Sequence, residues 1–331
     1  MFKEKNRSNY GIHIHRVKTI HAAAVVIVVI VLVTISVPFI LSLKNKAGNE
    51  KKDLLRFWEN GSFDEAFSLS KTALLSKPMD YFLLTIHGFT AYQRGISQIN
   101  TFDTLTFIDE CIWSLRKALL LKDSARDGRV YYVLGKAYAY KGSDYADLAV
   151  KYLEKARELS YNAVDIPEYL GIAYAAIGDY RSSVEAFSLA LRPAAGVSAA
   201  GIPDFANASD LLLISIARSY IALEEKETAK AYLLQCVEIS RDSKTRFTAR
   251  LLLGEILKDS GDLEGAEGQF AGILEESGEN AEARYQLGEL YALKGDAAGA
   301  RAEWRQTLRK DPAHAKARAR LNMQGGGQYV W

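Results

Sequence analysis

Histidine and cysteine are the side chains most able to do chemistry here, and the chain has five histidines and two cysteines. The pair His13 and His15 could begin a metal site, but no cysteine or carboxylate cluster stands near it. His87 and His314 lie far apart in the sequence, so a Ser-His-Asp or Cys-His arrangement is hard to assemble. The sequence also contains no Walker loop, no His-Glu-x-x-His and no Cys-x-x-Cys. We therefore predict no catalytic residues, no metal site and no cofactor, and expect that the protein is not an enzyme.

Acid–base chemistry by paired carboxylates is the remaining possibility. Glu224-Glu225 and Glu275-Glu276 are such pairs, but both fall at expected helix ends or turns. We interpret them as solvated charges. The formal net charge of +2 indicates neither a nucleic-acid binder nor an acidic tail. No small-molecule substrate is predicted.

The elements that position the side chains begin with an uncharged apolar run over residues 22–43. As a helix these residues would extend about 33 Å at roughly 1.5 Å per residue, which matches the hydrocarbon core of a bilayer of about 30 Å. A cleaved signal peptide would have a shorter apolar region and an A-x-A-like site. Leu41-Ser42-Leu43-Lys44 offers no such site. We predict one transmembrane helix over 22–43, after a short basic tail over 1–21, which places the chain in contact with the lipid bilayer.

The orientation of this anchor depends on the lysines and arginines at its two ends. Five precede it (Lys3, Lys5, Arg7, Arg16, Lys18) and five follow it (Lys44, Lys46, Lys51, Lys52, Arg56), so the positive-inside rule is nearly silent. Acidic residues dilute the second group, and a short leading tail is easily retained in the cytoplasm. We expect a single-pass protein of the bacterial inner membrane whose following domain lies in the periplasm.

The remainder of the chain is organised by a unit that is clearest at residues 281–312. Two short amphipathic helices are expected there, separated by Gly295-Asp296 and ended by Asp311-Pro312. The residues that line their facing sides are Leu287, Gly288, Tyr291, Ala300, Trp304 and Leu308. A Leu-Gly pair, a Tyr, an Ala, an aromatic residue and a closing Pro at these offsets resemble a tetratricopeptide (TPR) repeat.

The unit recurs in phase along the chain. The small-residue slot of each first helix is occupied in turn by Leu54, Gly88, Gly135, Gly171, Ala217, Gly254 and Gly288. The steps between them are 34, 47, 36, 46, 37 and 34 residues, against a TPR period of about 34. The two long steps predict insertions, one around Ile96–Glu110 and one over Arg192–Ala206. Cys111 and Cys236 fall where second helices need a small residue, and we expect two buried thiols.

The resemblance implies an all-α fold, a TPR-type α-solenoid of about seven helix-turn-helix repeats that follows the transmembrane helix. The solenoid would extend over residues 44–322 and end in a capping helix near Ala313–Leu321, because the outermost repeat otherwise exposes its apolar face. A Gly-rich tail over 323–331 follows.

In TPR arrays the first helices line a concave groove that holds a peptide or a helix of a partner protein. By helical spacing, positions six and three before the slot, and one and four after it, face that groove. The predicted partner-binding residues are Phe82, Phe89, Tyr92, Arg129, Tyr132, Lys136, Tyr140, Arg218, Glu255, Tyr285 and Glu289. A Lys/Asn clamp for a chaperone's carboxylate end is not evident, because the apolar Ile172 separates Lys136 from Arg218.

Together these features predict a membrane-anchored scaffold for protein–protein contacts in a bacterial envelope assembly. Three more specific roles stay open at this point. The protein could be an ancillary chaperone-like subunit beside the secretion translocon, a collar component of a periplasmic flagellar motor, or an accessory that presents a peptide to an enzyme, as in cytochrome maturation.

Overall fold

A computed structural model describes residues 49–121, 127–191 and 209–324, and every regular element in these ranges is helical. The chain divides into two units, Met1–Ser124 and Ala125–Trp331. None of the described helices is both long enough and apolar enough to cross a bilayer. The predicted membrane helix 22–43, the insertion 192–206 and most of the tail 323–331 lie outside the described residues. The prediction of an all-α repeat fold is confirmed.

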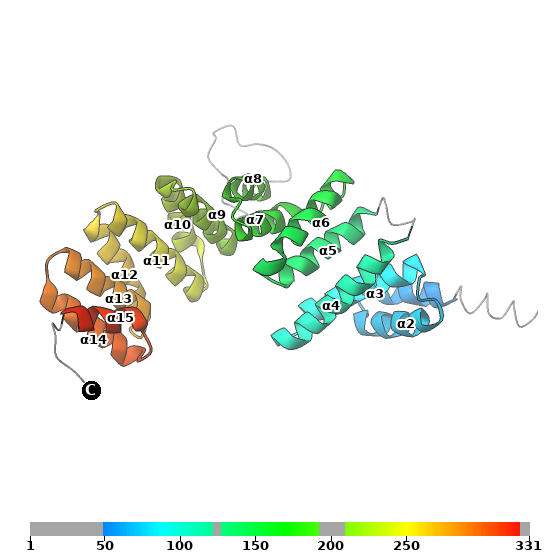
Figure 1. Ribbon diagram of the computed structural model, residues 1–331, viewed down its shortest axis with the longest axis horizontal. Coiled ribbons are helices and arrows are strands. Elements are labelled where there is room, and N and C mark those ends of the chain that lie inside the picture. The colour runs from blue at the N-terminus through cyan, green and yellow to red at the C-terminus, as the bar shows by residue number, and fades with distance from the viewer. Residues whose placement is uncertain (1–48, 122–126, 192–208, 325–331) are drawn as a thin grey trace, which may run out of the picture. The chain divides into compact units, whose positions relative to one another are not determined.

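The described part of the first unit contains two helix pairs (Figure 1). A helix over residues 49–59 pairs with α2 (Phe63–Ser76), and α3 (Tyr81–Ile96) pairs with α4 (Thr101–Ala118). The predicted insertion around Ile96–Glu110 is wrong, because Asn100 caps a helix that already begins at Thr101 by accepting the backbone N–H of Asp103 at 2.8 Å. Longer helices and a longer connection after Ala118 take up the additional residues of this step.

The second unit contains five helix pairs and a last helix among its described residues (Figure 1). Its helices are α5 (Gly128–Tyr140), α6 (Ala146–Glu158), α7 (Ile166–Ala176), α8 (Tyr180–Ala190), α9 (Asp210–Ala222), α10 (Lys226–Ile239), α11 (Ser243–Asp259), α12 (Leu263–Glu276), α13 (Ala281–Leu293), α14 (Ala297–Lys310) and α15 (Ala315–Gln324). We call the helix 49–59 and the odd-numbered helices α3 to α13 first helices, and their partners α2 to α14 second helices.

A glycine followed by an aspartate makes several of the turns within a pair. Gly178, Gly261 and Gly295 have φ between 81° and 85°, a left-handed conformation that glycine adopts without a steric penalty. The aspartate that follows caps the second helix; Asp296, for example, accepts the backbone N–H of Gly299 at 2.9 Å. In the fifth repeat Glu224 occupies the glycine position at φ 63°. The expected placement of Glu224-Glu225 at a turn is therefore confirmed.

The slot residues lie where the two helices of each pair cross, and all seven are buried. A Cβ atom at Gly171 would lie 2.5 Å from the ring of Phe187, and one at Gly288 would lie 2.5 Å from the indole of Trp304. Only glycine permits this approach, so each large residue of the second helix fills the space that the missing side chain leaves.

Neighbouring repeats are joined by a continuous apolar core and by ion pairs. In the second unit one cluster of buried residues extends from Phe187 in α8 to Leu290 in α13. Lys226 pairs with Asp259 at 2.9 Å and Lys310 with Glu279 at 2.5 Å, each across one repeat boundary. These two ion pairs therefore link neighbouring repeats.

Candidate functional site: the first-helix surface

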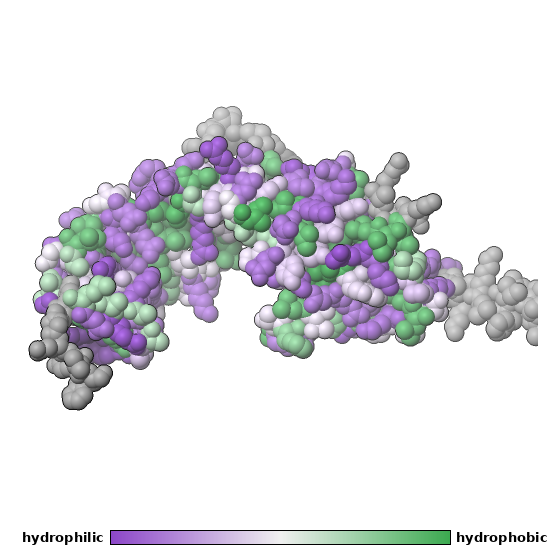
Figure 2. Space-filling view, viewed as in Figure 1, coloured by the Kyte–Doolittle hydropathy of each residue, from purple (hydrophilic) through white to green (hydrophobic). Residues whose placement is uncertain are grey.

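First helices of neighbouring repeats contact one another in the second unit, where α5 packs on α7, α7 on α9 and α9 on α11. We call the exposed side of α5, α7, α9 and α11 the first-helix surface. On the face drawn in Figure 2, apolar residues form small groups among polar ones rather than one broad apolar area.

In the first unit the three aromatic residues that we predicted to bind a partner pack against neighbouring side chains. Phe82 is half-buried beneath Lys51, whose Nζ lies 5.2 Å from the ring centroid. Phe89 is half-buried with its ring centroid 6.1 Å from that of Trp58. Tyr92 is only 4% exposed. Tyr92 is thus a core residue and not a contact for a partner, while Phe82 and Phe89 keep partly open rings.

Two predicted partner-binding residues on α5, Tyr132 and Lys136, form contacts between repeats. Asp165, which precedes α7, accepts hydrogen bonds from the Tyr132 hydroxyl at 2.7 and 2.8 Å and from Lys136 Nζ at 2.6 Å. Burial, with Asp165 beside it, raises the pKa of the Tyr132 hydroxyl, so this group remains a proton donor. Tyr132 and Lys136 therefore connect α5 to the start of α7 through Asp165.

The other predicted residues of α5 stay at the surface. Arg129 is exposed, and its guanidinium pairs with Asp127 at 2.8 Å. Tyr140 is exposed at the end of α5.

The predicted acidic end of the surface is also largely occupied by internal contacts. Glu255 accepts Gln286 Nε2 at 3.1 Å, and burial raises its pKa. Tyr285 is 7% exposed, with its ring 4.9 Å from that of His314. Glu289 pairs with Arg320 of α15 at 2.5 Å. Tyr285 belongs to the core, and Glu289 joins the last helix to α13.

Arg218 on α9 differs from these residues. It is exposed and makes no ion pair with any residue that the structure describes. It borders a hollow of about 350 Å³ between α7 and α9. The lining consists of Ile172, Ala175, Ala176, Tyr180, Phe187, Ser215, Arg218, Ser219 and Ala222.

The hollow exists because its walls carry small side chains. Ala175 and Ala176 on α7 and Ala222 on α9 leave room above the ring of Phe187, which is fully buried. Ile172 forms one wall and is 44% exposed. The Ser183 hydroxyl of α8 donates to the carbonyl of Gly171 in α7 at 2.8 Å and lies 2.9 Å from the Ser219 hydroxyl in α9, so hydrogen bonds join the three helices around the hollow. The arrangement can accept an apolar side chain, with a cation at its edge.

Our predicted partner-binding residues included Arg218 but none of the alanines that shape the hollow, although Ala175 lies at a groove position, four residues after the slot Gly171. The pair Ala175-Ala176 contains a signal for two of them, because after every other slot at least one of the two corresponding positions holds a larger residue, such as Tyr92, Lys258 or Leu293. Small side chains at two adjacent surface positions of one first helix indicate a depression between that helix and the first helix of the next repeat.

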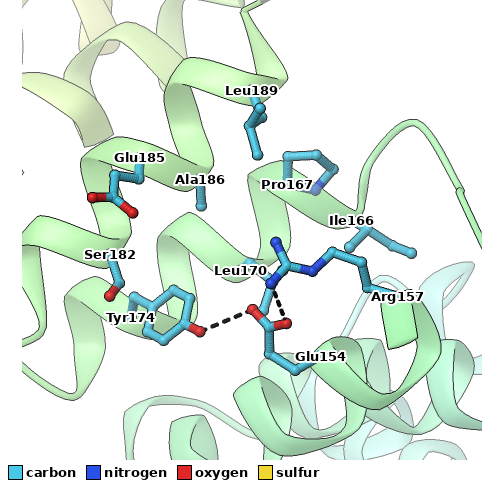
Figure 3. Close-up of a pocket in the computed structure, with 10 residues that line it drawn as sticks. All are labelled: Glu154, Arg157, Ile166, Pro167, Leu170, Tyr174, Ser182, Glu185, Ala186 and Leu189. Carbon is cyan, nitrogen blue, oxygen red and sulfur yellow. Dashed lines mark hydrogen bonds and ion pairs between the residues drawn. The ribbon is translucent and has the colours of Figure 1, made fainter. Parts of the chain in front are cut away.

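A second, smaller hollow of about 130 Å³ lies among α6, α7 and α8 (Figure 3). Leu170 and Ala186 line it, and two of its three charged residues, Glu154 and Arg157, pair with each other. Glu154 accepts the Tyr174 hydroxyl at 2.9 Å and pairs with Arg157 at 2.5 Å, as the dashed lines of Figure 3 show. Burial and this carboxylate raise the pKa of Tyr174 to about 12. The hollow is thus a weaker candidate than the one beside Arg218.

The structure also assembles a serine–histidine–carboxylate arrangement that we expected to be difficult. Ser70 Oγ lies 2.9 Å from His87 Nδ1, and His87 Nε2 lies 3.1 Å from Glu110 Oε1, so α2, α3 and α4 each supply one member. Ser70 is 0% exposed and His87 is buried beneath the ring of Phe67 at 4.5 Å. No substrate can reach Ser70 Oγ in this arrangement, and the network joins three helices.

Among the described residues no cluster of histidine, cysteine and carboxylate side chains could hold a metal ion. Cys111 and Cys236 are both free and buried, as expected. Burial raises the pKa of both thiols, that of Cys236 to about 11, which leaves them protonated and poorly nucleophilic.

Comparisons with known proteins agree with the helical repeats. Residues 212–243 and 257–321 each match a family model of the tetratricopeptide repeat. No curated protein matches the sequence.

Several solved structures are similar in fold. The C-terminal part of a TPR repeat-containing protein from Cytophaga hutchinsonii has a TM-score of 0.57 and 14% identity, covering 84% of this chain and 100% of that one. PilF of Pseudomonas aeruginosa has a TM-score of 0.51 and 14% identity, covering 71% and 97%. YrrB, a TPR protein with an unusual peptide-binding site, has a TM-score of 0.48 and 24% identity, covering 63% and 97%. The first two likenesses support the fold and do not extend to function.

Proposed function

Because the chain is a tetratricopeptide-repeat protein, we propose that it is a scaffold that holds a segment of a partner protein against the first-helix surface of its second unit. The observation that carries the proposal is the hollow between α7 and α9. It combines about 350 Å³ of space, the 44% exposed Ile172, and Arg218, which makes no ion pair with the residues that the structure describes. Arginine is one of the residue types enriched at the hot spots of protein–protein interfaces, and such hot spots lie in well-packed, desolvated pockets. In this proposal the protein acts by binding and not as an enzyme.

Site-specific crosslinking tests the proposed surface. A photoreactive amino acid in place of Ile172 should crosslink one major partner in cells, because this side chain forms a wall of the hollow. The matched control is the same replacement at Leu234, which is similarly exposed but lies on the second helix α10. Crosslinks from Leu234 alone, or from neither position, would contradict the first-helix surface as the binding face.

The finer part of the proposal concerns where the scaffold acts. We propose that residues 22–43 anchor it in the bacterial inner membrane and that the repeats lie in the periplasm, within an envelope assembly. The uncharged length of this run supports the anchor. The identity of the partner crosslinked at Ile172 distinguishes a role at the secretion translocon from one at the flagellar motor or in cytochrome maturation.

Protease added to intact spheroplasts tests the side of the membrane. If the repeats are periplasmic, the full-length band should disappear while a cytoplasmic marker protein survives. Protection of the repeats until the membrane is broken would place them in the cytoplasm.

A further inference from the structure

We propose that the hollow between α7 and α9 binds an apolar side chain of a partner segment whose neighbouring residue is aspartate or glutamate, with Arg218 pairing to that carboxylate. This inference rests on the proposed function and adds the chemistry of the partner. It concerns a side-chain carboxylate within the segment, not the carboxylate at the end of a chain.

The charge expected of the partner follows from which lysines and arginines of α5, α7 and α9 already pair with a carboxylate. α5 carries Arg129 and Lys136, which pair with Asp127 and Asp165. α7 contains no lysine or arginine. Arg218 on α9 is therefore the one cation of these three described helices without a carboxylate partner among the described residues. A guanidinium in this position favours a carboxylate, which it can bind through two parallel hydrogen bonds.

The apolar half of the ligand follows from the lining. Alanines form much of the wall, and the ring of Phe187 closes the bottom. An inserted side chain would cover Ile172 and remove water from around Arg218. Because the local dielectric falls when water leaves, the pairing of Arg218 with a carboxylate becomes stronger, and a lysine at the same place becomes less favourable. Apolar burial and charge pairing thus select the same short segment.

The carboxylates of the two helices do not already satisfy Arg218. Asp210, at the start of α9, accepts the Ser240 hydroxyl at 2.7 Å. Glu168 lies in the first turn of α7 and outside the lining of the hollow.

A random peptide library displayed on phage tests the proposal without a known partner. The full chain, purified in detergent, is the bait, and the peptides are displayed with their carboxyl ends fused to the coat protein, so that no free carboxyl end is offered. The wild type should enrich peptides in which aspartate or glutamate stands beside leucine, isoleucine or phenylalanine. The variant Arg218→Glu should enrich lysine or arginine beside the same apolar residues. Arg305→Glu, at an exposed arginine of α14, should leave the wild-type preference unchanged.

One enriched peptide, made with an amidated end and a fluorescent label, then gives the size of the effect. Its Kd should rise about tenfold for Arg218→Glu, and exchange of its acidic residue for lysine should reverse the preference between the two proteins. Ala222→Trp, which fills the hollow at an exposed position, should remove binding while circular dichroism stays unchanged.

The possible failures can be told apart. Peptides that lose binding in Ala222→Trp but show no acidic preference would overturn the inference about Arg218 and leave the first-helix surface intact. Peptides whose binding is unaffected by Ala222→Trp, or the absence of any enriched peptide, would overturn both this inference and the proposed binding surface.

Discussion

Replacement of Trp304 by alanine should lower the free energy of unfolding of the last repeat by about 3–5 kcal/mol, the usual cost of removing a buried tryptophan. Trp304 is 1% exposed, and its indole fills the space left open by Gly288. Ala300, Tyr285 and Ala317 of α15 belong to the same buried cluster. A small side chain cannot fill this volume, because neither α13 nor α15 can move inward without breaking its own contacts.

The loss should remain local. Each repeat of a solenoid contacts only its neighbours, so a weakened end unfolds before the rest of the array. Hydrogen exchange followed by mass spectrometry should show faster exchange in α13, α14 and α15, while peptides from α5 to α9 keep their wild-type rates.

Trp113→Ala is the matched control for this prediction. Trp113 is 57% exposed on α4, and Lys117 Nζ lies 4.1 Å from its ring centroid. Its removal should change stability by no more than about 0.5–1 kcal/mol. Equal losses from the two substitutions would show that Trp304 is not part of a tightly packed core.

Acid should destabilise the first unit through His87, and this is the second large effect we expect. Burial is the main cause that lowers the pKa of His87 from its ordinary value of 6.5, although Glu110 partly opposes it. At pH below about 6.5 the unfolded chain therefore binds a proton that the folded unit does not. The free energy of unfolding has its full value above this pH and decreases as the pH falls toward the lowered pKa of His87. The limiting slope is about 1.4 kcal/mol per pH unit.

The other titratable groups around His87 do not change the stability in the pH range in which His87 acts. Burial alone would raise the pKa of Glu110, but hydrogen bonds from His87 and Lys71 outweigh it, and the net shift is downward from 4.5. The stabilisation by this carboxylate is therefore lost only at more acidic pH. The buried thiol of Cys111, whose pKa is raised, stays protonated throughout.

Hydrogen exchange of α3 between pH 7 and pH 5, corrected for the intrinsic effect of pH, measures this prediction. The wild type should lose protection in α2, α3 and α4 as the pH falls, and His87→Gln should be less stable at pH 7 but show a flatter dependence on pH. A wild-type slope that persists in His87→Gln would assign the acid sensitivity to another group.

The sequence by itself determined the repeat architecture. Slot residues such as Gly171 and Gly288 recur in phase with aromatic residues of the second helix, and this pairing is local: a missing side chain on one helix is filled by a large one about 16 residues later. Turn glycines and capping aspartates act within a few residues, so they too could be recognised in the sequence. The step of 47 residues shows where this approach fails. Part of the additional length lies in α3 and α4, which are longer than other helices and keep the helical pattern. When residues are counted against a fixed repeat period, this additional length is mistaken for an inserted segment.

Only the tertiary structure decided which groove residues are available to a partner. Helical spacing gives the direction of a side chain from its own helix, but exposure depends on what the next repeat places opposite to it. Asp165 engages Tyr132 and Lys136 from the following repeat, and His314, which directly precedes the last helix, covers Tyr285. Arg218 stays open because α7 offers it alanines and Ile172 instead of a carboxylate. Contacts between repeats join residues about 30 positions apart, and no periodic pattern within one helix records them.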